Sequence, residues 1–252
     1  MSSKQREKFR KKLFIIEILL VIVIIIICIY IVCWIVSCLK NNKIKDKISN
    51  NVEVNYVETD VGKQEAEYNI DFESLKKVNE DVVAWIKVNG TEIEYPIVQA
   101  KDNDYYLKRN LEKEYNTNGW IFADYRNKLD GTDKNIIIYG NNVKDNSMFG
   151  SLKNILNEEG YNDRKNYIID FITEKENQRY QVFSVYQIKT EDYYINTEFE
   201  EGKFQDFTEI LKRRSKKNFG IGIYEYESIL TLSTCANNYR DRIVLHAKKI
   251  NY

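Results

Sequence analysis

The stretch TLSTCANNYRDR, residues 231–242, joins two segments that are typical of neighbouring β-strands. Residues 228–235 are rich in β-branched and apolar side chains, and residues 242–249 are again apolar with alternation. The asparagines and the aspartate between them favour a turn. Cys235 would therefore end one strand and Arg242 would open the next, and adjacent strands lie roughly 5 Å apart. A guanidinium beside a thiol favours the thiolate, which is the nucleophilic form.

The cysteine also has a simpler interpretation, because most single cysteines on strands are small buried hydrophobic residues. Three of the four cysteines, Cys28, Cys33 and Cys38, fall in an apolar N-terminal segment. Cys235 is thus the only thiol in the rest of the chain and can form no disulfide within it. An unpaired thiol in an exported domain is exposed to oxidation unless it is buried or used. Both interpretations, a reactive thiol and a packed one, stay open at this point.

The N-terminal segment has the length and polarity of a membrane helix. Ile18–Val36 carries no charge, and 19 residues rise about 28 Å as a helix, which is enough to cross the hydrocarbon layer. The sequence therefore predicts a basic tail, a transmembrane helix, a spacer and a folded domain, over residues 1–12, 13–39, 40–69 and 70–252. Residues 1–12 contain six basic side chains and one acidic one, which predicts a cytoplasmic N-terminus and a domain outside the cell.

Two processing alternatives lead to the same side of the membrane. A cleaved signal peptide would have a shorter apolar region and an Ala-x-Ala site, which does not follow here. The segment Ile35–Cys38 loosely resembles a lipoprotein cleavage box, although the apolar stretch before it is long for that role. Outside the first 12 residues the chain has more acidic than basic side chains, which argues against nucleic acid as a partner.

The remaining chain has many short strand patterns and few helical ones. Trp85–Tyr95 predicts a hairpin whose Asn89-Gly90 pair suits a two-residue type I′ turn. Other strands are predicted over residues 135–140, 167–173 and 179–190. Helices are predicted over residues 204–216 and from Asp145 or Asn146 to about Asn157. This pattern predicts a mainly β fold, a closed barrel with added helices.

The motif TLSTC, followed seven residues later by Arg242 in the segment RIVLH, resembles the active-site end of class B sortases. Sortases are membrane-anchored cysteine transpeptidases of Gram-positive bacteria. Residues 85–107 and the segment GWIFADYRN at 119–127 resemble the opening strands of the same domain. The resemblance covers roughly residues 70–250 and implies a sortase-like closed β-barrel of about eight strands.

One position departs from the family pattern. In class B sortases the central strand is followed by Tyr-Gly-His-Asn-Met-Lys-Asp, and here residues 139–145 read YGNNVKD. Asn141 therefore stands where the resemblance implies a catalytic histidine, which protonates the departing amine and later deprotonates the incoming one. An amide has no usable pKa near neutrality and can only donate or accept hydrogen bonds. General acid–base catalysis contributes about 10²–10⁴ in rate, so the resemblance implies an impaired site.

The resemblance assigns roles to the other candidate residues. Cys235 would form a thioester with the substrate, and Arg242 would bind the substrate carbonyl or a developing oxyanion. Ser233 and Thr234 would line the substrate groove. His246, the only histidine, lies four strand residues, about 13 Å, beyond Arg242 and is predicted to be a packed or surface residue. The sequence has no zinc-ligand spacing and no Gly-rich phosphate loop, so no metal or cofactor is expected.

The resemblance implies a transpeptidase that cleaves a sorting signal after Thr, in an Asn-Pro-x-Thr-type motif, and passes the acyl group to an amine of peptidoglycan. A second hypothesis is a weak or inactive relative that binds sorting signals or a partner sortase, as the asparagine at the histidine position would suggest. A third is a tethered β-domain in which Cys235 is only core packing. In each case the predicted location is the cell membrane, with a single span and the main domain outside.

Overall fold

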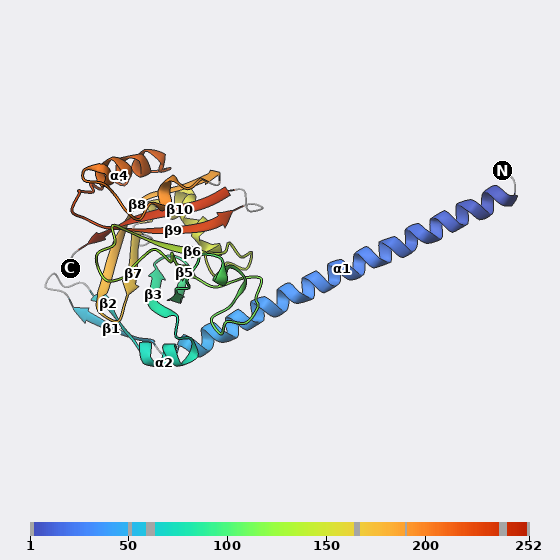
Figure 1. Cartoon of the computed structure of the whole chain (residues 1–252), viewed down its shortest axis with the longest axis horizontal. Helices are drawn as coiled ribbons and strands as arrows, with labels where there is room; N and C mark the ends of the chain where they lie inside the picture. The colour runs from blue at the N-terminus through green and yellow to red at the C-terminus, as the bar shows by residue number, and fades with distance from the viewer. Residues whose placement is uncertain are drawn as a thin grey trace.

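A long N-terminal helix leads into a domain built on a β-barrel (Figure 1). The computed structural model describes most of the chain, with short gaps: residues 3–49, 52–58, 64–163, 167–189, 191–236 and 241–250. Helix α1, Ser3–Ser49, is followed by the two-stranded sheet β1–β2 and the short helix α2. The barrel and its attached helices follow from Val82 onward.

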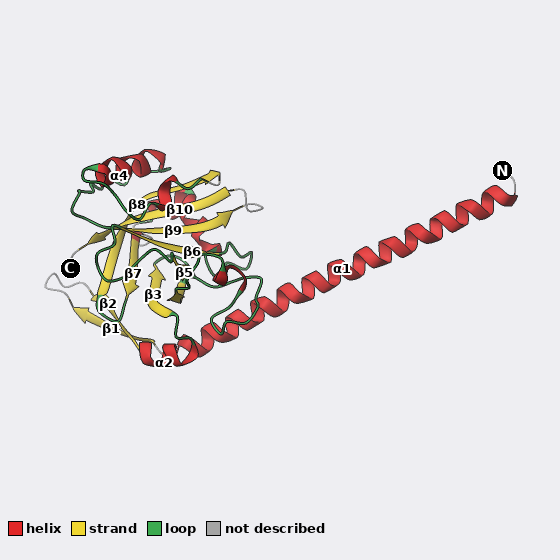
Figure 2. Ribbon diagram, in the orientation of Figure 1, coloured by secondary structure: helices red, strands yellow, loops and turns green. Residues whose placement is uncertain are grey.

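Eight strands close the barrel in the order β10-β8-β7-β3-β4-β5-β6-β9 (Figure 2). Neighbouring strands are antiparallel except for the parallel pairs β4–β5 and β6–β9. The predicted closed barrel of eight strands is confirmed. The strand bounds are β3 Val82–Val88, β4 Glu94–Val98, β5 Phe122–Ala123, β6 Asn135–Gly140, β7 Ile168–Ile172, β8 Asn177–Lys189, β9 Ile229–Ala236 and β10 Asp241–Ile250.

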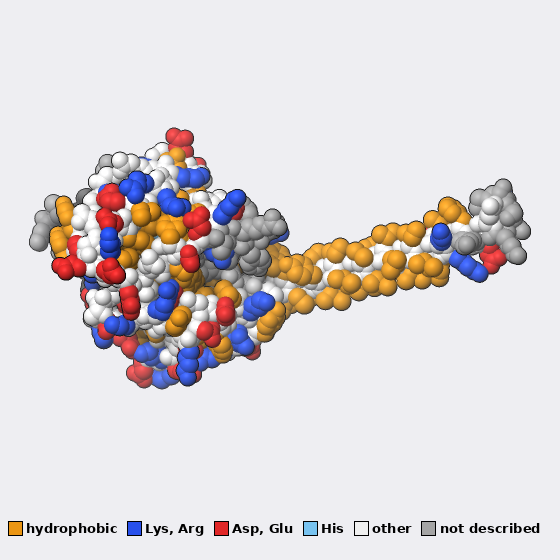
Figure 3. Space-filling model, turned by 45° about the horizontal axis from the view of Figure 1, so that its top comes forward, with side chains coloured by type: hydrophobic (Ala, Val, Ile, Leu, Met, Phe, Trp, Pro, Cys, Tyr) orange, Lys and Arg blue, Asp and Glu red, His pale blue; other side chains and the backbone are white. Residues whose placement is uncertain are grey.

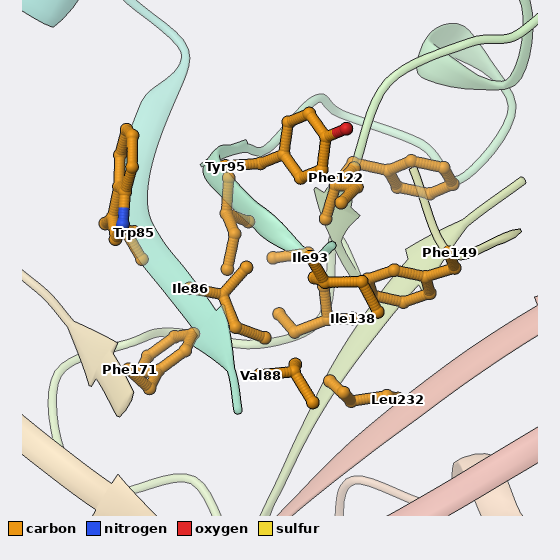
Figure 4. Packing of buried hydrophobic residues seen from close by; sticks show 14 of the residues in the cluster. Trp85, Ile86, Val88, Ile93, Tyr95, Phe122, Ile138, Phe149, Phe171 and Leu232 are labelled. Atoms are coloured by element: carbon orange, nitrogen blue, oxygen red, sulfur yellow. The ribbon is translucent and has the colours of Figure 1, made fainter. Parts of the chain in front are cut away.

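The barrel interior is filled by the alternate side chains of its strands, because successive residues of a strand point to opposite faces. Ile86 and Val88 of β3 meet Ile138 of β6 and Leu232 of β9 in the main core (Figure 4). The opposite face of β9 and β10 is also covered. There Val244 joins a second buried cluster beneath helix α4. Burial on both faces explains why these strands read as nearly continuous apolar runs in the sequence.

Helix α4, Lys203–Arg214, packs on the outside of the barrel. Its side chains Phe204, Phe207 and Leu211 are buried in the second cluster, which is the stripe that the sequence predicted. The helix predicted over residues 204–216 is therefore confirmed, and it begins and ends within two residues of the expected bounds. Smaller helical turns connect the strands: α2 Phe72–Val78, η1 Tyr105–Lys108, η2 Gly150–Leu156, α3 Glu158–Asn162 and η4 Tyr193–Ile195.

The helix predicted from residue 145 to 157 is wrong in its first half. Asn146 and Met148 have positive φ angles of 67° and 51°, which a right-handed helix does not allow. The chain instead folds back so that the backbone N–H of Phe149 donates to the carbonyl of Asn141 at 3.1 Å. Helical geometry begins only at Gly150, where any side chain would collide with the backbone of Val143.

The hairpin of β3 and β4 is confirmed, but its turn is not the predicted one. Lys87 pairs with Glu94, and the connection spans residues 89–93 instead of two residues. Gly90 has a positive φ of 73°, whereas Asn89 does not, and a type I′ turn requires positive φ at both. The hydroxyl of Thr91 donates to the carbonyl of Val88 and stabilises the longer loop.

In the segment predicted as a spacer, residues 40–69, the described parts have regular structure. Helix α1 continues to Ser49, and strands β1, Val52–Glu58, and β2, Gln64–Ile70, form an antiparallel pair. Ahead of this segment α1 exposes a continuous apolar surface, with the charged side chains near its N-terminus (Figure 3). Residues 5–41 are long and apolar enough to cross a membrane, as the predicted span requires, and a signal sequence would pass the same test.

Candidate active site

The antiparallel pair β9–β10 places Cys235 directly opposite Arg242 in the backbone register. Directly opposed residues in such a pair have Cα atoms roughly 4.5–5.5 Å apart. Cys235 and Arg242 are therefore paired across the two strands, as the residue pattern predicted. The side chain of Cys235 lies outside the described part of the structure. Arg242 is half-buried at the start of β10.

A cavity of about 240 Å³ lies beside this pair of strands, and four of the five predicted site residues line it. Asn141, Ser233, Thr234 and Arg242 all contribute to its wall. The parallel register of β6 and β9 explains part of this grouping, because it sets Gly140 beside Thr234. The rest of the wall comes from β5, β6 and the segment before and within η1: Asn103, Asp104, Leu107, Phe122, Tyr139 and Gly140.

Ser233 and Thr234 are both buried in the wall of the cavity. The hydroxyl of Ser233 shares a hydrogen bond of 2.9 Å with the hydroxyl of Tyr194, in the helical turn η4. This bond ties β9, shortly before Cys235, to a segment that is 39 residues distant in the chain. The position of the Ser233 hydroxyl is therefore set by the fold before any ligand binds.

The side-chain amide of Asn141 is held by two backbone carbonyls. Its nitrogen donates to the carbonyl of Leu107 at 3.0 Å and to the carbonyl of Asn118 at 3.1 Å. Because two carbonyls can only accept hydrogen bonds, they fix which end of the amide is the NH₂ group. Gly119 is required beside it, since a Cβ at that position would lie 2.7 Å from the Asn141 amide nitrogen. Both N–H donors of Asn141 are thus used within the protein.

Comparison with known proteins identifies the family of the chain. A family profile for the sortase domain matches residues 86–250. Sortase B of Staphylococcus aureus (strain NCTC 8325 / PS 47) is 42% identical over 183 residues, which are 71% of this chain and 74% of that protein. The chain belongs to the sortase family and is of the sortase B type.

Two solved structures extend the match to the fold. The Staphylococcus aureus sortase B–substrate complex is 41% identical, with a TM-score of 0.67 over 71% of this chain and 84% of that one. A crystal structure of sortase B complexed with triglycine is also 41% identical, with a TM-score of 0.67 over 71% of this chain and 85% of that one. Sortase B-type proteins are cysteine transpeptidases, and these matches place the chain in that class.

A buried carboxylate supports the cavity wall of this sortase. Asp124 is fully buried and receives two hydrogen bonds from the guanidinium of Arg126, at 2.8 and 2.7 Å. The hydroxyl of Tyr139 and the amide of Asn103, both in the wall, also donate to Asp124, at 2.9 and 3.0 Å. Burial by itself would raise the pKa of Asp124, but the bonds from Arg126 and Tyr139 outweigh it and hold that pKa below its usual value.

The single histidine is distant from the thiol position along the sheet. His246 pairs with Thr231, four residues before Cys235 on β9, as the strand spacing predicted. It is fully buried, with its ring nitrogens bonded to the hydroxyls of Thr231, at 2.8 Å, and Tyr186, at 2.9 Å. Burial lowers the pKa of His246 to about 3, so the ring is neutral at physiological pH. His246 is a packed residue of the sortase domain.

Sequence reasoning missed six residues of the wall: Asn103, Asp104, Leu107, Phe122, Tyr139 and Gly140. The segments that contain the first four were noted only for their family resemblance. Tyr139 could have been found, because it lies two residues before Asn141, next to the end of strand β6. Across the residues that the structure describes, no group of three or more His, Cys, Asp or Glu side chains could hold a metal ion.

Proposed function

We propose that this protein cleaves a sorting signal after Thr through a Cys235 thioester and attaches the released protein to peptidoglycan, and that Asn141 makes this turnover slow. The observation that carries the proposal is the register of Cys235 opposite Arg242 next to a cavity that Asn141 also lines. The likeness to a sortase B–substrate complex supports a peptide ligand in that cavity.

The first half-reaction would proceed as follows. The Cys235 thiolate attacks the carbonyl carbon of the Thr residue, and Arg242 stabilises the oxyanion that forms. The C–S bond persists as the thioester, while the C–N bond breaks and its electron pair leaves with the amine. That amine must take up a proton to leave readily. Asn141 has no acidic proton to give, and both of its N–H groups already bond to backbone carbonyls, so we expect the proton to come from water.

In the second half-reaction an amine of peptidoglycan attacks the thioester carbon. The new C–N bond forms, the C–S bond breaks to restore the thiolate, and the surplus amine proton passes to water. Ser233 and Thr234 are buried in the cavity wall, and in this proposal they shape the groove for the peptide. Arg242 again balances the negative charge on the carbonyl oxygen.

The proposed location is the outer face of the cell membrane. The apolar part of α1 supplies a span of sufficient length, and the basic residues before it favour a cytoplasmic N-terminus. The sortase domain would then meet sorting signals and peptidoglycan on the outside. Membrane anchoring is a property of sortases in general, and the exposed apolar surface of α1 fits it (Figure 3).

A second candidate function is a binding module for sorting signals or for a partner sortase. The clamped amide of Asn141 favours it, because a site without a proton donor still has its cavity and its guanidinium. Binding without cleavage would use the same peptide groove. The two candidates differ in whether a covalent bond forms at Cys235.

The test is to incubate the full chain, reconstituted in lipid nanodiscs, with a quenched sorting-signal peptide. We expect slow cleavage and, by mass spectrometry, a peptide adduct on Cys235 that triglycine releases. The matched control is Cys235→Ala, which should give neither product. Binding of the peptide with no adduct and no cleavage would establish the binding module instead, and absence of binding would refute both candidates.

A further inference from the structure

The outer end of α1 is packed against the sortase domain. Its side chains at positions 38, 41, 44 and 48 are buried, and this spacing of three to four residues defines one face of a helix. Leu39, one residue from the buried Cys38, is 63% exposed. The helix therefore presents one face to the domain, as a docked element does, and Figure 1 shows its last turns lying against the domain.

The docked face forms hydrogen bonds with the loop of residues 114–119, which we name the brace loop, while Ile44 and Ile48 pack in the main core cluster. The amide of Asn116 donates to the side-chain oxygen of Asn41 at 2.8 Å and to the carbonyl of Ser37 at 3.2 Å. The amide of Asn41 in turn donates to the carbonyl of Gly119 at 3.4 Å. Asn41 and Asn116 are both buried, and buried amides are costly unless they are hydrogen-bonded. The side-chain NH₂ group of each asparagine therefore finds its partners on the other element.

The brace loop also holds Asn141. The side-chain nitrogen of Asn118 lies 3.2 Å from the sulfur of Cys38, and its backbone carbonyl accepts the bond from Asn141. A single residue thus joins the helix on one side to the cavity wall on the other. The charge-free part of α1 runs from Ile18 to Leu39, so this junction lies close to the point where the helix would leave the bilayer.

We propose that α1 is a docked brace and not a free tether: its outer end positions the brace loop, and through Asn118 it positions Asn141 and the cavity beside the membrane surface. This inference deepens the proposed function and rests on it for the meaning of the cavity. Asn41 and Asn116 act as positioning residues. Figure 1 agrees with the geometry, since β9 ends and β10 begins on the side of the domain toward which α1 extends.

Docking itself is tested by cross-linking in the full chain, in lipid nanodiscs, with the four native cysteines replaced by alanine. Asn41→Cys with Asn116→Cys should form an intramolecular disulfide under mild oxidation, because these side chains touch. Lys43→Cys with Asn116→Cys is the matched control, since Lys43 faces solvent. We expect the first pair to cross-link at least tenfold faster. Equal rates, or no cross-link in either pair, would overturn the proposal.

The effect on the cavity is tested by hydrogen exchange, which does not depend on activity. Ile48→Asp places a charge on the docked face, where the native side chain is 1% exposed, and should release the helix. We expect faster exchange in the brace loop and in residues 140–149, with no change in β7 and β8. Lys43→Asp carries the same charge on the exposed face and should change neither region. If Ile48→Asp abolishes the cross-link between positions 41 and 116 but leaves hydrogen exchange near Asn141 unchanged, the helix does not brace the site.

A third measurement separates this inference from the proposed function. If the chain cleaves the peptide, Asn116→Ala should lower kcat/KM several-fold, because the cavity wall that Asn141 helps to form loses its support from the helix. If the chain does not cleave, the exchange and cross-linking results still decide whether α1 is docked. If a variant with an undocked helix stays active with an unchanged kcat/KM, the brace is overturned even where the transpeptidase is confirmed.

Discussion

Replacing Asn141 by histidine is the most informative perturbation of this site. In asparagine and in histidine a side-chain nitrogen is bonded directly to Cγ. The imidazole Nδ1–H of Asn141→His would therefore occupy the place of the present amide nitrogen. That nitrogen now donates to the carbonyls of Leu107 and Asn118. Nδ1–H can keep one of these bonds and thereby fixes the ring, while Nε2 projects farther into the cavity. Asn141→His would thus supply the proton donor and acceptor that the amide lacks.

The magnitudes favour a net gain in activity at a moderate loss of stability. Asn141→His gives up one of two hydrogen bonds, and a carbonyl left unpaired costs about 1–3 kcal/mol. General acid–base catalysis contributes about 10²–10⁴ in rate, equivalent to a barrier lower by about 3–5 kcal/mol. We expect kcat/KM for peptide cleavage to rise by about 100-fold or more. The rate should also acquire a pH dependence near about pH 6.5, where an unperturbed imidazole titrates.

The assay is cleavage of a quenched sorting-signal peptide by the full chain over a range of pH from acid to mildly alkaline, together with thermal melting of each variant. The neighbouring Asn142 offers a matched control, because it does not line the cavity and Asn142→His adds the same ring one position away. Asn141→Gln, which keeps an amide, should not increase the rate. Equal gains at both positions, or a folded Asn141→His variant with no gain, would refute the assignment of Asn141 to the histidine position.

Two further predictions concern stability and its pH dependence. Burial lowers the pKa of His246 to about 3 in the folded protein, whereas the pKa in the unfolded chain is about 6.5. The contribution of His246 to the free energy of unfolding is therefore fully present above about pH 6.5 and decreases as the pH falls from there toward the folded pKa. Between about pH 6.5 and 5 the free energy of unfolding should drop by about 2 kcal/mol, a slope that His246→Gln removes in urea titrations. Asp124→Asn should lower the free energy of unfolding by about 2–4 kcal/mol at neutral pH. The figure is reduced because solvent partly screens the exposed guanidinium of Arg126. Because the pKa of Asp124 is lowered, that cost should shrink as the pH falls through the lowered value, whereas the exposed Asp130→Asn should change unfolding little.

The sequence was most informative where one strong local pattern coincided with the structure. The apolar alternation of β9 and β10, with turn residues between, correctly set Cys235 opposite Arg242. The stripe of Phe204, Phe207 and Leu211 identified α4 in the same way. In these elements the side-chain period and the buried face agree, so local reasoning suffices.

It was least informative where distant contacts decide the conformation. Residues 145–149 have helix-capping side chains, yet the chain folds back because Phe149 bonds to the backbone of Asn141. Residues 41–49 looked like a polar spacer because Ile44 and Ile48 are their only apolar positions. Both are buried, but the sequence alone does not show the surface of the domain against which they pack. The clamp on Asn141 could not be predicted either, since its partners, Leu107 and Asn118, are 34 and 23 residues away.

The clamp has a consequence for the two half-reactions that we propose. Departure of the amine from the first intermediate needs a donated proton, and Asn141, with both N–H groups bound to carbonyls, cannot give one. Attack by an incoming amine needs an acceptor for its N–H, and the amide oxygen is an acceptor. The asparagine should therefore slow formation of the thioester more than its resolution by an amine. Thioester made chemically on Cys235 from an activated peptide would then be discharged by triglycine faster than the chain can form it from an ordinary peptide. The reverse order of rates would mean that the amide hinders the acceptor step, and the site would be better described as a trap for the acyl group.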